Sequence, residues 1–319
     1  LDPQGYIVIS SDNSAVPILA YSFENNLNMN DIPVQLQRVL TNYNSQIRYL
    51  IDNEIIPDNE IRDLWENYLD GNIIRENSRS VEPLIEANWN QGGGWNDMCP
   101  SNTYVGCVAV AMGQVMHHWQ HPYTGTGFNM YYLPNYGFLS ADFETAYYDF
   151  ESMENDFPTE ASSLLLYHAG IAVDMHYSSY GSGASVCWDS NSAQAALDNN
   201  FNYNNDITCM NKIDYSEDEW GAILKDQLDR GWPVIYRGYS ESAGHAWNID
   251  GYDSMDYFHC NWGWGGSSNG YFYLDPLHPD TFSFVEDQAA LLNILPEGFE
   301  APFALFDFEI NNLEVTFDD

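Results

Sequence analysis

The chain has 319 residues, of which 45% are hydrophobic and 15% aromatic, a composition typical of packed globular proteins. Its length predicts roughly two domains, or one large α+β body with an extra lobe. Nine Lys and Arg residues stand against 47 Asp and Glu residues, and the formal net charge of −38 excludes nucleic acid and anionic membranes as partners, because binding phosphate requires clusters of basic side chains.

The sequence shows no sign of membrane insertion. It contains no run of 18 apolar residues, so we expect no transmembrane helix. The first ten residues lack the basic-then-apolar order of a signal peptide, which indicates a chain that begins after processing. The extreme acidity is typical of a solvated surface that keeps a protein in solution.

The first quarter of the chain differs from the rest in its pattern of predicted secondary structure. Two short β-branched and aromatic runs, at 5–10 and 16–22, flank a polar turn and predict a β-hairpin. Apolar residues at three- and four-residue spacing then predict a helix over 36–50. A second helix is expected over 59–69.

A polar segment at 71–84 follows these elements. It carries Gly, Asn, Ser and Pro with little periodicity, so we place a linker there. Arg75 and Arg79, two of the nine basic residues, lie in it. Because proteolysis concentrates in exposed polar linkers, this segment is a candidate processing site, after which the mature part would begin near 76–84.

Residues from Pro83 to about Pro296 predict one α+β body, with helices early and an antiparallel meander late. Its first helix is expected over 107–119, where the apolar residues form one stripe that ends before Pro122. Later helices are expected around 162–168, 193–199 and 218–228, and strands at 233–239, 245–252, 257–262, 270–275 and 290–295.

The end of the chain, 301–319, has no basic residue and alternates like a pair of strands. It predicts either an added edge hairpin or the start of a further domain. Acidic residues gather here and at 216–220, where we expect solvated surface and leave calcium binding open.

Cysteine chemistry is the first candidate for function. None of the five cysteines belongs to a Cys-x-x-Cys pair, and their irregular spacing does not indicate a zinc site. Cys107 follows Gly106 at the start of a predicted helix, where free backbone N–H groups and the helix dipole favour a thiolate. A buried structural cysteine is the alternative for any single residue of this type, so the assignment depends on partners elsewhere.

His245 and Asn261 are those partners. His245 follows Gly244 at the head of one strand, and Asn261 lies sixteen residues later near the end of the next. We expect the hairpin to bring the two opposite each other, within a residue or so of register. In a Cys-His-Asn set the imidazole accepts the thiol proton, the ion pair keeps the sulfur nucleophilic, and the amide orients the ring. Trp262 would cover the Asn–His hydrogen bond.

Several stretches resemble the streptopain family of papain-like secreted cysteine endopeptidases. They are VGCVAVAMGQVM around Cys107, GIAVDMHY at 170–177, GHAWNIDGY around His245, NWGWGG with the following NGYFYLDPLHP, and WNQGGGWN at 89–96. The N-terminal hairpin and helices also resemble the C-terminal part of the family's inhibitory propeptide. The resemblance thus covers residues 5 to about 295.

The resemblance implies an α+β, papain-like fold with a helical half and an antiparallel sheet half, preceded by an α+β prodomain fragment. It implies that Cys107 is the nucleophile and His245 the general base and acid. Asn261 would orient the histidine, and Gln91 with the Cys107 backbone N–H would form the oxyanion hole.

The substrate cleft is expected to be lined by Ser182, Gly183, Gly244 and Trp262. Family membership would also imply extended peptide substrates with an apolar side chain at the second position before the cleaved bond. The chain departs from the family pattern in three glycines and a tryptophan after Gln91 and in extra cysteines. These departures leave the subsite preference open.

We therefore predict three parts: residues 1–75, the C-terminal part of an inhibitory propeptide; residues 76–296, the catalytic domain; and residues 297–319, an acidic tail or the start of a further domain. The protein would be a secreted, extracellular cysteine endopeptidase, present as a zymogen or partial zymogen. Its partners would be protein or peptide substrates and its own propeptide, and no cofactor is expected. An inactive protein-binding scaffold of the same fold and a thiol acyltransferase or amidase are the alternatives.

Other candidates have structural interpretations. His117 and His121 lie four apart on a helix, but no Glu stands between them as in zinc peptidases, so we expect no metal there. The glycine-rich stretch at 261–270 lacks the Lys of a phosphate loop and is expected to form a rim of the cleft. The remaining cysteines, Cys99, Cys187, Cys209 and Cys260, allow up to two disulfides in three pairings that stay open.

Overall fold

The computed structural model describes residues 4–30, 32–72, 79–240, 243–274, 286–299, 307–311 and 314–318. The helices are α1 (Val34–Asp52), α2 (Asn59–Leu69), α3 (Cys107–Trp119), α4 (Glu160–Ala172), α5 (Ala193–Phe201) and α6 (Glu217–Asp229). The strands are β1 (Tyr6–Ile9), β2 (Ile18–Ser22), β3 (Phe128–Leu133), β4 (Gly137–Asp142), β5 (Thr208–Asn211), β6 (Val234–Ser240), β7 (Ala243–Tyr252), β8 (Phe258–Asn261), β9 (Gly270–Phe272), β10 (Glu286–Leu292), β11 (Asp307–Asn311) and β12 (Glu314–Asp318).

The predicted elements are confirmed with small shifts of their ends. All six expected helices are present, and α3 begins at Cys107 as its apolar stripe predicts. Each expected strand is present, although β10 begins and ends earlier than the sequence indicates. The hairpin β3–β4 and strand β5 are additional to the predicted elements.

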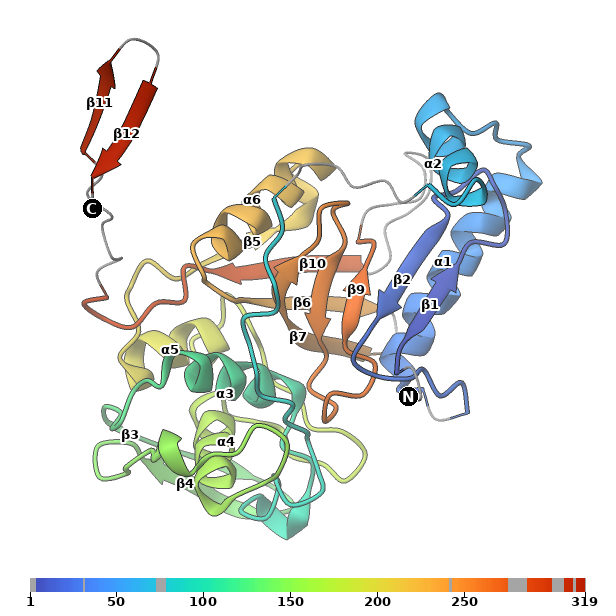
Figure 1. Cartoon of the computed structure of the whole chain (residues 1–319). Helices are drawn as coiled ribbons and strands as arrows, with labels where there is room; N and C mark the ends of the chain where they lie inside the picture. The colour runs from blue at the N-terminus through green and yellow to red at the C-terminus, as the bar shows by residue number, and fades with distance from the viewer. Residues whose placement is uncertain are drawn as a thin grey trace.

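One eight-stranded sheet joins the N-terminal hairpin to later strands of the chain, with the strand order β1-β2-β9-β8-β7-β6-β10-β5 (Figure 1). Every neighbouring pair in it is antiparallel. The N-terminal hairpin adds to one edge, where Ala20 lies opposite Phe272 and Tyr21 opposite Tyr271. The segment predicted to be a propeptide is therefore continuous with the main sheet.

The sheet separates two apolar cores because successive side chains point to opposite faces. Ala246 and Leu291 belong to the core built with α3, α4 and α5. Their neighbours Trp247 and Leu292 belong to the core built with α1 and α6. Figure 1 shows α3, α4 and α5 grouped together below the sheet. The predicted α+β class, with a helical half and an antiparallel sheet half, is confirmed.

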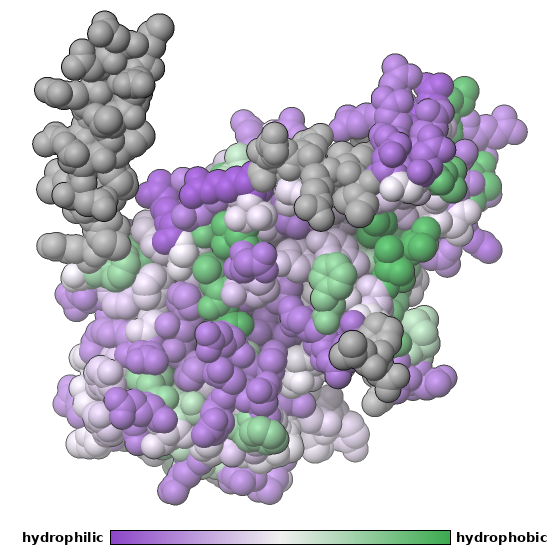
Figure 2. Space-filling view, in the orientation of Figure 1, coloured by the Kyte–Doolittle hydropathy of each residue, from purple (hydrophilic) through white to green (hydrophobic). Residues whose placement is uncertain are grey.

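The tail forms the strand pair that its alternation predicts. β11 and β12 pair with each other, with Ile310 opposite Val315, in a sheet of their own and not on an edge of the large one. Most of the described surface in the view of Figure 2 is hydrophilic, as the acidic composition implies. Among the described helices, none combines the length and the apolar character needed to cross a bilayer.

Candidate active site

Cys107 begins α3 directly after a glycine that no other residue could replace without strain. Gly106 has φ +96°, a conformation that disfavours side chains. A Cβ atom at this position would lie 2.6 Å from Met175 Sδ and 3.2 Å from the Ser182 carbonyl oxygen. The close approach of these segments sets the half-buried Cys107 at the free N-terminus of a helix whose next nine residues are buried.

Cys107 and His245 line one cavity of about 230 Å³. Its lining residues are Cys107, Val108, Ser182, Gly183, Ala184, Val186, Arg237, Gly244, His245 and Ala246. They come from α3, the 182–186 loop, β6 and β7. The two residues predicted as nucleophile and base are thus brought together with three of the four predicted cleft residues.

The His245 ring is held by a backbone carbonyl. Its Nε2 lies 3.1 Å from the Trp262 oxygen, and since a carbonyl oxygen only accepts, Nε2 carries the proton of the neutral ring. Nδ1 then holds the lone pair, and this buried atom makes no hydrogen bond with the described residues. His245 can therefore accept a proton through Nδ1.

Three indole rings surround the His245 imidazole nearly in parallel. The ring centroids of Trp264, Trp247 and Trp262 lie 4.8, 6.0 and 6.2 Å from it, at interplanar angles of 21°, 15° and 20°. These rings shield the hydrogen bond of Nε2 from water, but this bond goes to the Trp262 carbonyl and not to Asn261 as predicted. Trp264 was not among the predicted residues, although the Trp-Gly-Trp sequence that contains it was part of a motif.

Asn261 does not contact His245 as predicted. The β7–β8 register places Asn261 opposite Asn248, three residues beyond the histidine. The connection between the two strands spans 253–257, where Asp253 Oδ1 accepts hydrogen bonds from the Met255 and Tyr257 N–H groups, both at 2.9 Å. The orienting group is the carbonyl of the next residue along the chain.

Trp262 is likewise not a cleft residue. Trp262 is 3% exposed and packs edge-on against Phe272 in the core built with α1 and α6. It is absent from the cavity lining because strand alternation turns its indole inward. Trp262 therefore contributes its carbonyl and its ring to His245, and the prediction of substrate contact is wrong.

Ser182 and Gln91 are held by hydrogen bonds to the segment that leads into Cys107. Ser182 Oγ donates to the Tyr104 carbonyl and accepts from the Ser178 N–H, so its side chain connects its own loop to the segment before Cys107. The Gln91 carbonyl accepts a 2.9 Å hydrogen bond from the Val105 N–H, two residues before Cys107. Gln91 is not among the cavity-lining residues, so its role at the oxyanion stays a prediction.

The protonation of the pair differs from the expected ion pair. Burial raises the pKa of the Cys107 thiol despite hydrogen bonds from the backbone N–H groups of Ala246 and Val108. Burial lowers the pKa of His245 to about 4, against the opposing effect of the Trp262 carbonyl. Both shifts favour a neutral thiol beside a neutral imidazole in this conformation, since desolvation outweighs the helix N-terminus.

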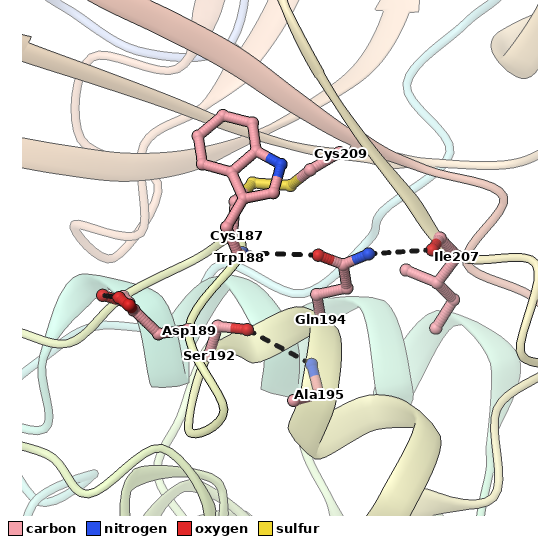
Figure 3. The surroundings of a disulfide bond; sticks show 9 residues. Cys187, Trp188, Asp189, Ser192, Gln194, Ala195, Ile207 and Cys209 are labelled. Atoms are coloured by element: carbon pink, nitrogen blue, oxygen red, sulfur yellow. Dashed lines mark hydrogen bonds between the residues drawn. A yellow bond between two sulfur atoms is a disulfide. The ribbon is translucent and has the colours of Figure 1, made fainter.

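A disulfide between Cys187 and Cys209 fastens the cavity wall to strand β5 (Figure 3). It resolves the open pairing, with Cys99 and Cys260 free and buried. Cys187 directly follows Val186 of the cavity. In Figure 3 the indole of Trp188 lies beside the sulfur atoms, and Gln194 connects the Trp188 N–H to the Ile207 carbonyl.

Arg237 is a cavity residue that the sequence analysis missed. Its guanidinium lies over the Trp188 ring, 4.8 Å from the centroid. Trp188 in turn lines a second pocket of about 250 Å³. The sequence did carry a signal for Arg237: the chain has only nine Lys and Arg residues, and this one lies within a predicted strand.

The histidines of α3 and its end bind separate segments. His118 Nδ1 lies 2.9 Å from the Leu84 carbonyl, and His121 Nε2 lies 2.9 Å from the Asn202 carbonyl. His117 packs against Trp89 at 5.1 Å. Within the described residues, no group of three His, Cys, Asp or Glu side chains has a metal-binding arrangement.

Comparison with known proteins identifies the family. The sequence model of the Peptidase C10 family matches residues 89–272, and that of the Spi protease inhibitor matches residues 2–47. The thiol protease/hemagglutinin PrtT of Porphyromonas gingivalis is 28% identical over 94% of this chain, which spans 37% of its length. Streptopain of Streptococcus pyogenes is 29% identical over 92% of this chain and 78% of its own length.

Solved structures agree with these relatives. A prointerpain A fragment of Prevotella intermedia superimposes with a TM-score of 0.73 at 26% identity, covering 92% of this chain and 93% of the fragment. The active interpain A cysteine protease of the same organism covers 70% of this chain and 100% of its own, with a TM-score of 0.60 and 28% identity. These matches confirm the predicted papain-like fold. Because the family match covers more than half of its residues, the chain belongs to the Peptidase C10 family.

Proposed function

We propose that this chain is a secreted cysteine endopeptidase, made as a zymogen or partial zymogen, with Cys107 as nucleophile and His245 as general base and acid. The observation that carries the proposal is the shared cavity of about 230 Å³, which both side chains line. The unpaired Nδ1 of His245 supplies the required acceptor within the same region. Membership of a peptidase family supports the reaction class.

The reaction begins when His245 Nδ1 takes the thiol proton as the Cys107 sulfur attacks the carbonyl carbon of a peptide bond. The imidazolium, held through Nε2 by the Trp262 carbonyl, then gives that proton to the leaving amine. A water molecule, which gives a proton to His245, then attacks the acyl carbon of the acyl-enzyme. The carboxylic acid product is released and the Cys107 thiol is restored. Burial favours the neutral form of both groups before substrate binds.

The negative charge on the carbonyl oxygen develops next to the N-terminus of α3. The Cys107 backbone N–H and the helix dipole stabilise it there. We assign the second donor to the Gln91 side amide, because the Gln91 carbonyl is bonded to the chain that leads into Cys107. Ala184, Val186 and Ala246 give the cavity an apolar wall that suits an apolar substrate side chain.

The N-terminal residues 1–75 are proposed as the C-terminal part of an inhibitory propeptide, residues 76–296 as the catalytic domain and 297–319 as a tail or further domain. The Spi protease inhibitor match to residues 2–47 supports the first assignment. In the linker, Arg79 is 68% exposed even though it pairs with Asp229 at 3.1 Å, which leaves it open to a peptidase. Arg75 lies outside the described residues.

Secretion is proposed on chemical grounds. A disulfide such as Cys187–Cys209 persists in oxidising compartments and is rare in reducing ones. The likeness to the thiol protease PrtT supports proteins or peptides as the substrates.

The deciding experiment is hydrolysis of a fluorogenic peptide together with labelling by a covalent thiol-protease inhibitor. Cys107→Ala should abolish both, whereas the matched control Cys99→Ala, at a buried thiol outside the lining of this cavity, should keep both. Labelling without hydrolysis would indicate a scaffold, and transfer of the acyl group to an added amine in place of water would indicate an acyltransferase. Either result would overturn the proposal.

A further inference from the structure

Three buried amide side chains form a cluster behind the catalytic cavity. Gln114 on α3, Asn248 on β7 and Asn261 on β8 are 0%, 0% and 1% exposed. We call this set the amide cluster. None of the three lines the cavity, so the proposed chemistry does not use them directly.

Gln114 lies at the centre of the amide cluster and uses both its N–H donors and its oxygen in hydrogen bonds. Its Nε2 donates to the Ala87 carbonyl at 2.7 Å and to Asn261 Oδ1 at 3.0 Å. Its Oε1 accepts from Asn248 Nδ2 at 2.9 Å. Asn248 Nδ2 also reaches the Ala111 carbonyl at 3.3 Å, and Asn261 Nδ2 donates to Ala87 at 3.1 Å.

Each member of the cluster belongs to an element that carries one part of the site. Gln114 lies seven residues after Cys107, two turns further along the same helix. Asn248 lies three residues after His245 on the same strand. The two hydrogen bonds from Asn248 to α3 therefore connect the base strand directly to the nucleophile helix.

Asn261 acts on one particular peptide unit, the one between Trp262 and Gly263. The N–H of this unit, on Gly263, donates to Asn261 Oδ1 at 3.3 Å. Its carbonyl, on Trp262, accepts from His245 Nε2 at 3.1 Å. A peptide unit is planar, so holding its N–H also sets the direction of its carbonyl. Donation through the N–H also polarises the carbonyl toward the imidazole.

A continuous path of hydrogen bonds thus runs from the nucleophile helix to the imidazole. It passes from Gln114 to Asn261, through the Trp262–Gly263 peptide unit, to His245. Directional hydrogen bonds fix this geometry in a way that apolar side chains of equal volume would not.

We propose that Gln114, Asn248 and Asn261 are positioning residues that set the distance and orientation of His245 relative to Cys107. The proposal rests on the proposed function for the identity of the catalytic pair. It also gives Asn261 an indirect role in orienting His245, through the peptide unit and not through its own amide. Gln114 is the decisive member, because it contacts both of the others.

The test compares Gln114→Met with a matched control, Gln227→Met, in the full chain. Gln227 is also buried, at 6% exposure, and its amide is bound on both sides by Asn293, but it lies on α6 and lines no catalytic cavity. The readouts are the melting temperature, kcat and KM on a fluorogenic peptide after self-processing, and the rate of Cys107 alkylation by iodoacetamide across pH, followed by peptide mass spectrometry.

Both variants should melt at lower temperature than the wild type, whereas only Gln114→Met should lose activity. We expect its kcat to fall by about 10- to 100-fold with KM within about threefold, as a displaced catalytic pair requires. The pH profile of alkylation should shift in Gln114→Met and not in Gln227→Met. Gln114→Glu should recover part of the lost kcat, since burial keeps its carboxyl protonated and able to both accept and donate.

The proposal is wrong if Gln114→Met keeps the wild-type kcat and alkylation profile within about twofold while its melting temperature falls, because the cluster would then be structural only. If Gln114→Met does not fold, Asn248→Ala, which removes only the Gln114 and Ala111 hydrogen bonds, decides by the same readouts. If the wild type hydrolyses no peptide, the proposed function fails, and the alkylation profile still decides on the cluster.

Discussion

The Nε2 atom of His259, on β8, lies 3.0 Å from Glu24 Oε1 in the chain that follows β2. On the other side of the ring, Nδ1 lies 2.6 Å from Asp250 Oδ1. Burial by itself would lower the pKa of His259, but Asp250 and Glu24 raise it to about 10, so the ring is charged at neutral pH. A buried cation of the main sheet thus binds the segment that we propose to be the propeptide.

Glu24→Gln should weaken the attachment of the N-terminal segment within a defined pH window. The pKa of His259 is raised in the folded protein. Its contribution to the stability of the fold is therefore complete below pH 6.5, its ordinary pKa, and is lost as the pH rises toward 10. The hydrogen bond with His259 lowers the pKa of Glu24. The contribution of Glu24 to stability is therefore complete above pH 4.5 and is lost as the pH falls through the lowered pKa. Melting temperatures of variant and wild type should therefore differ most between pH 4.5 and 6.5.

The matched control is Asp63→Asn, an isosteric loss of charge at an exposed position of α2. It should change the melting temperature little and without this pH dependence. A Glu24→Gln effect that stays constant from acid to alkaline pH would show that the ion pair does not hold the segment.

Removal of the N-terminal segment should raise the initial rate of hydrolysis. Hydrogen bonds from Tyr6 Oη to the Ser268 carbonyl, at 3.0 Å, and from Tyr257 Oη to the Ile18 carbonyl, at 2.8 Å, hold the segment on the sheet edge. Tethering gives it a high effective concentration, so modest intrinsic affinity suffices for inhibition. Turnover of a fluorogenic peptide by the 1–319 chain should show a lag that a chain starting near residue 80 lacks. Equal rates without a lag would make the segment a structural lobe.

Gln91→Ala should reduce kcat by about 10²- to 10³-fold, because one of two oxyanion donors is lost and the Cys107 N–H is left. The melting temperature should change little, since the hydrogen bonds of Gln91 to Asn90 and Val105 use its backbone. Steady-state kinetics and thermal melting of the purified variant check both statements. An unchanged kcat would assign the second oxyanion donor to another group.

Cys187→Ser combined with Cys209→Ser should destabilise the protein by about 3 kcal/mol, from the entropy of a loop closed over 22 residues. Because Val186 beside the disulfide lines the cavity, we expect KM to rise more than kcat falls. Calorimetry and steady-state kinetics measure the two effects, with Cys99→Ala as the control that leaves the disulfide intact. An unchanged KM would show that the wall keeps its shape without the disulfide.

Local patterns in the sequence were sufficient to predict the helix that begins at Cys107. The apolar stripe predicted its extent, and Gly106 before Cys107 indicated its beginning, because these signals concern neighbouring residues. The sequence also indicated Cys107 and His245 as a candidate pair, because few residue types can act as a nucleophile and as its base. The propeptide-like hairpin was also predicted, but not its attachment to β9.

Other features depend on contacts that no local pattern contains. The predicted β7–β8 register was wrong, because the Asp253 side chain supports the connection between these strands and Asn261 lies opposite Asn248. As a result, the group that binds the His245 ring is the Trp262 carbonyl and not Asn261. The Cys187–Cys209 pairing required the spacing of two distant segments.

By itself, the sequence determined the elements and the family resemblance, and it named Cys107 and His245 as the proposed catalytic pair, since these follow from residue type and short-range periodicity. Only the tertiary structure decided which group orients His245, which cysteines pair and whether Cys107 and His245 rest as ions. The physical reason is that hydrogen-bond partners, disulfide geometry and desolvation depend on distances between segments far apart in the chain, and folding alone sets those distances.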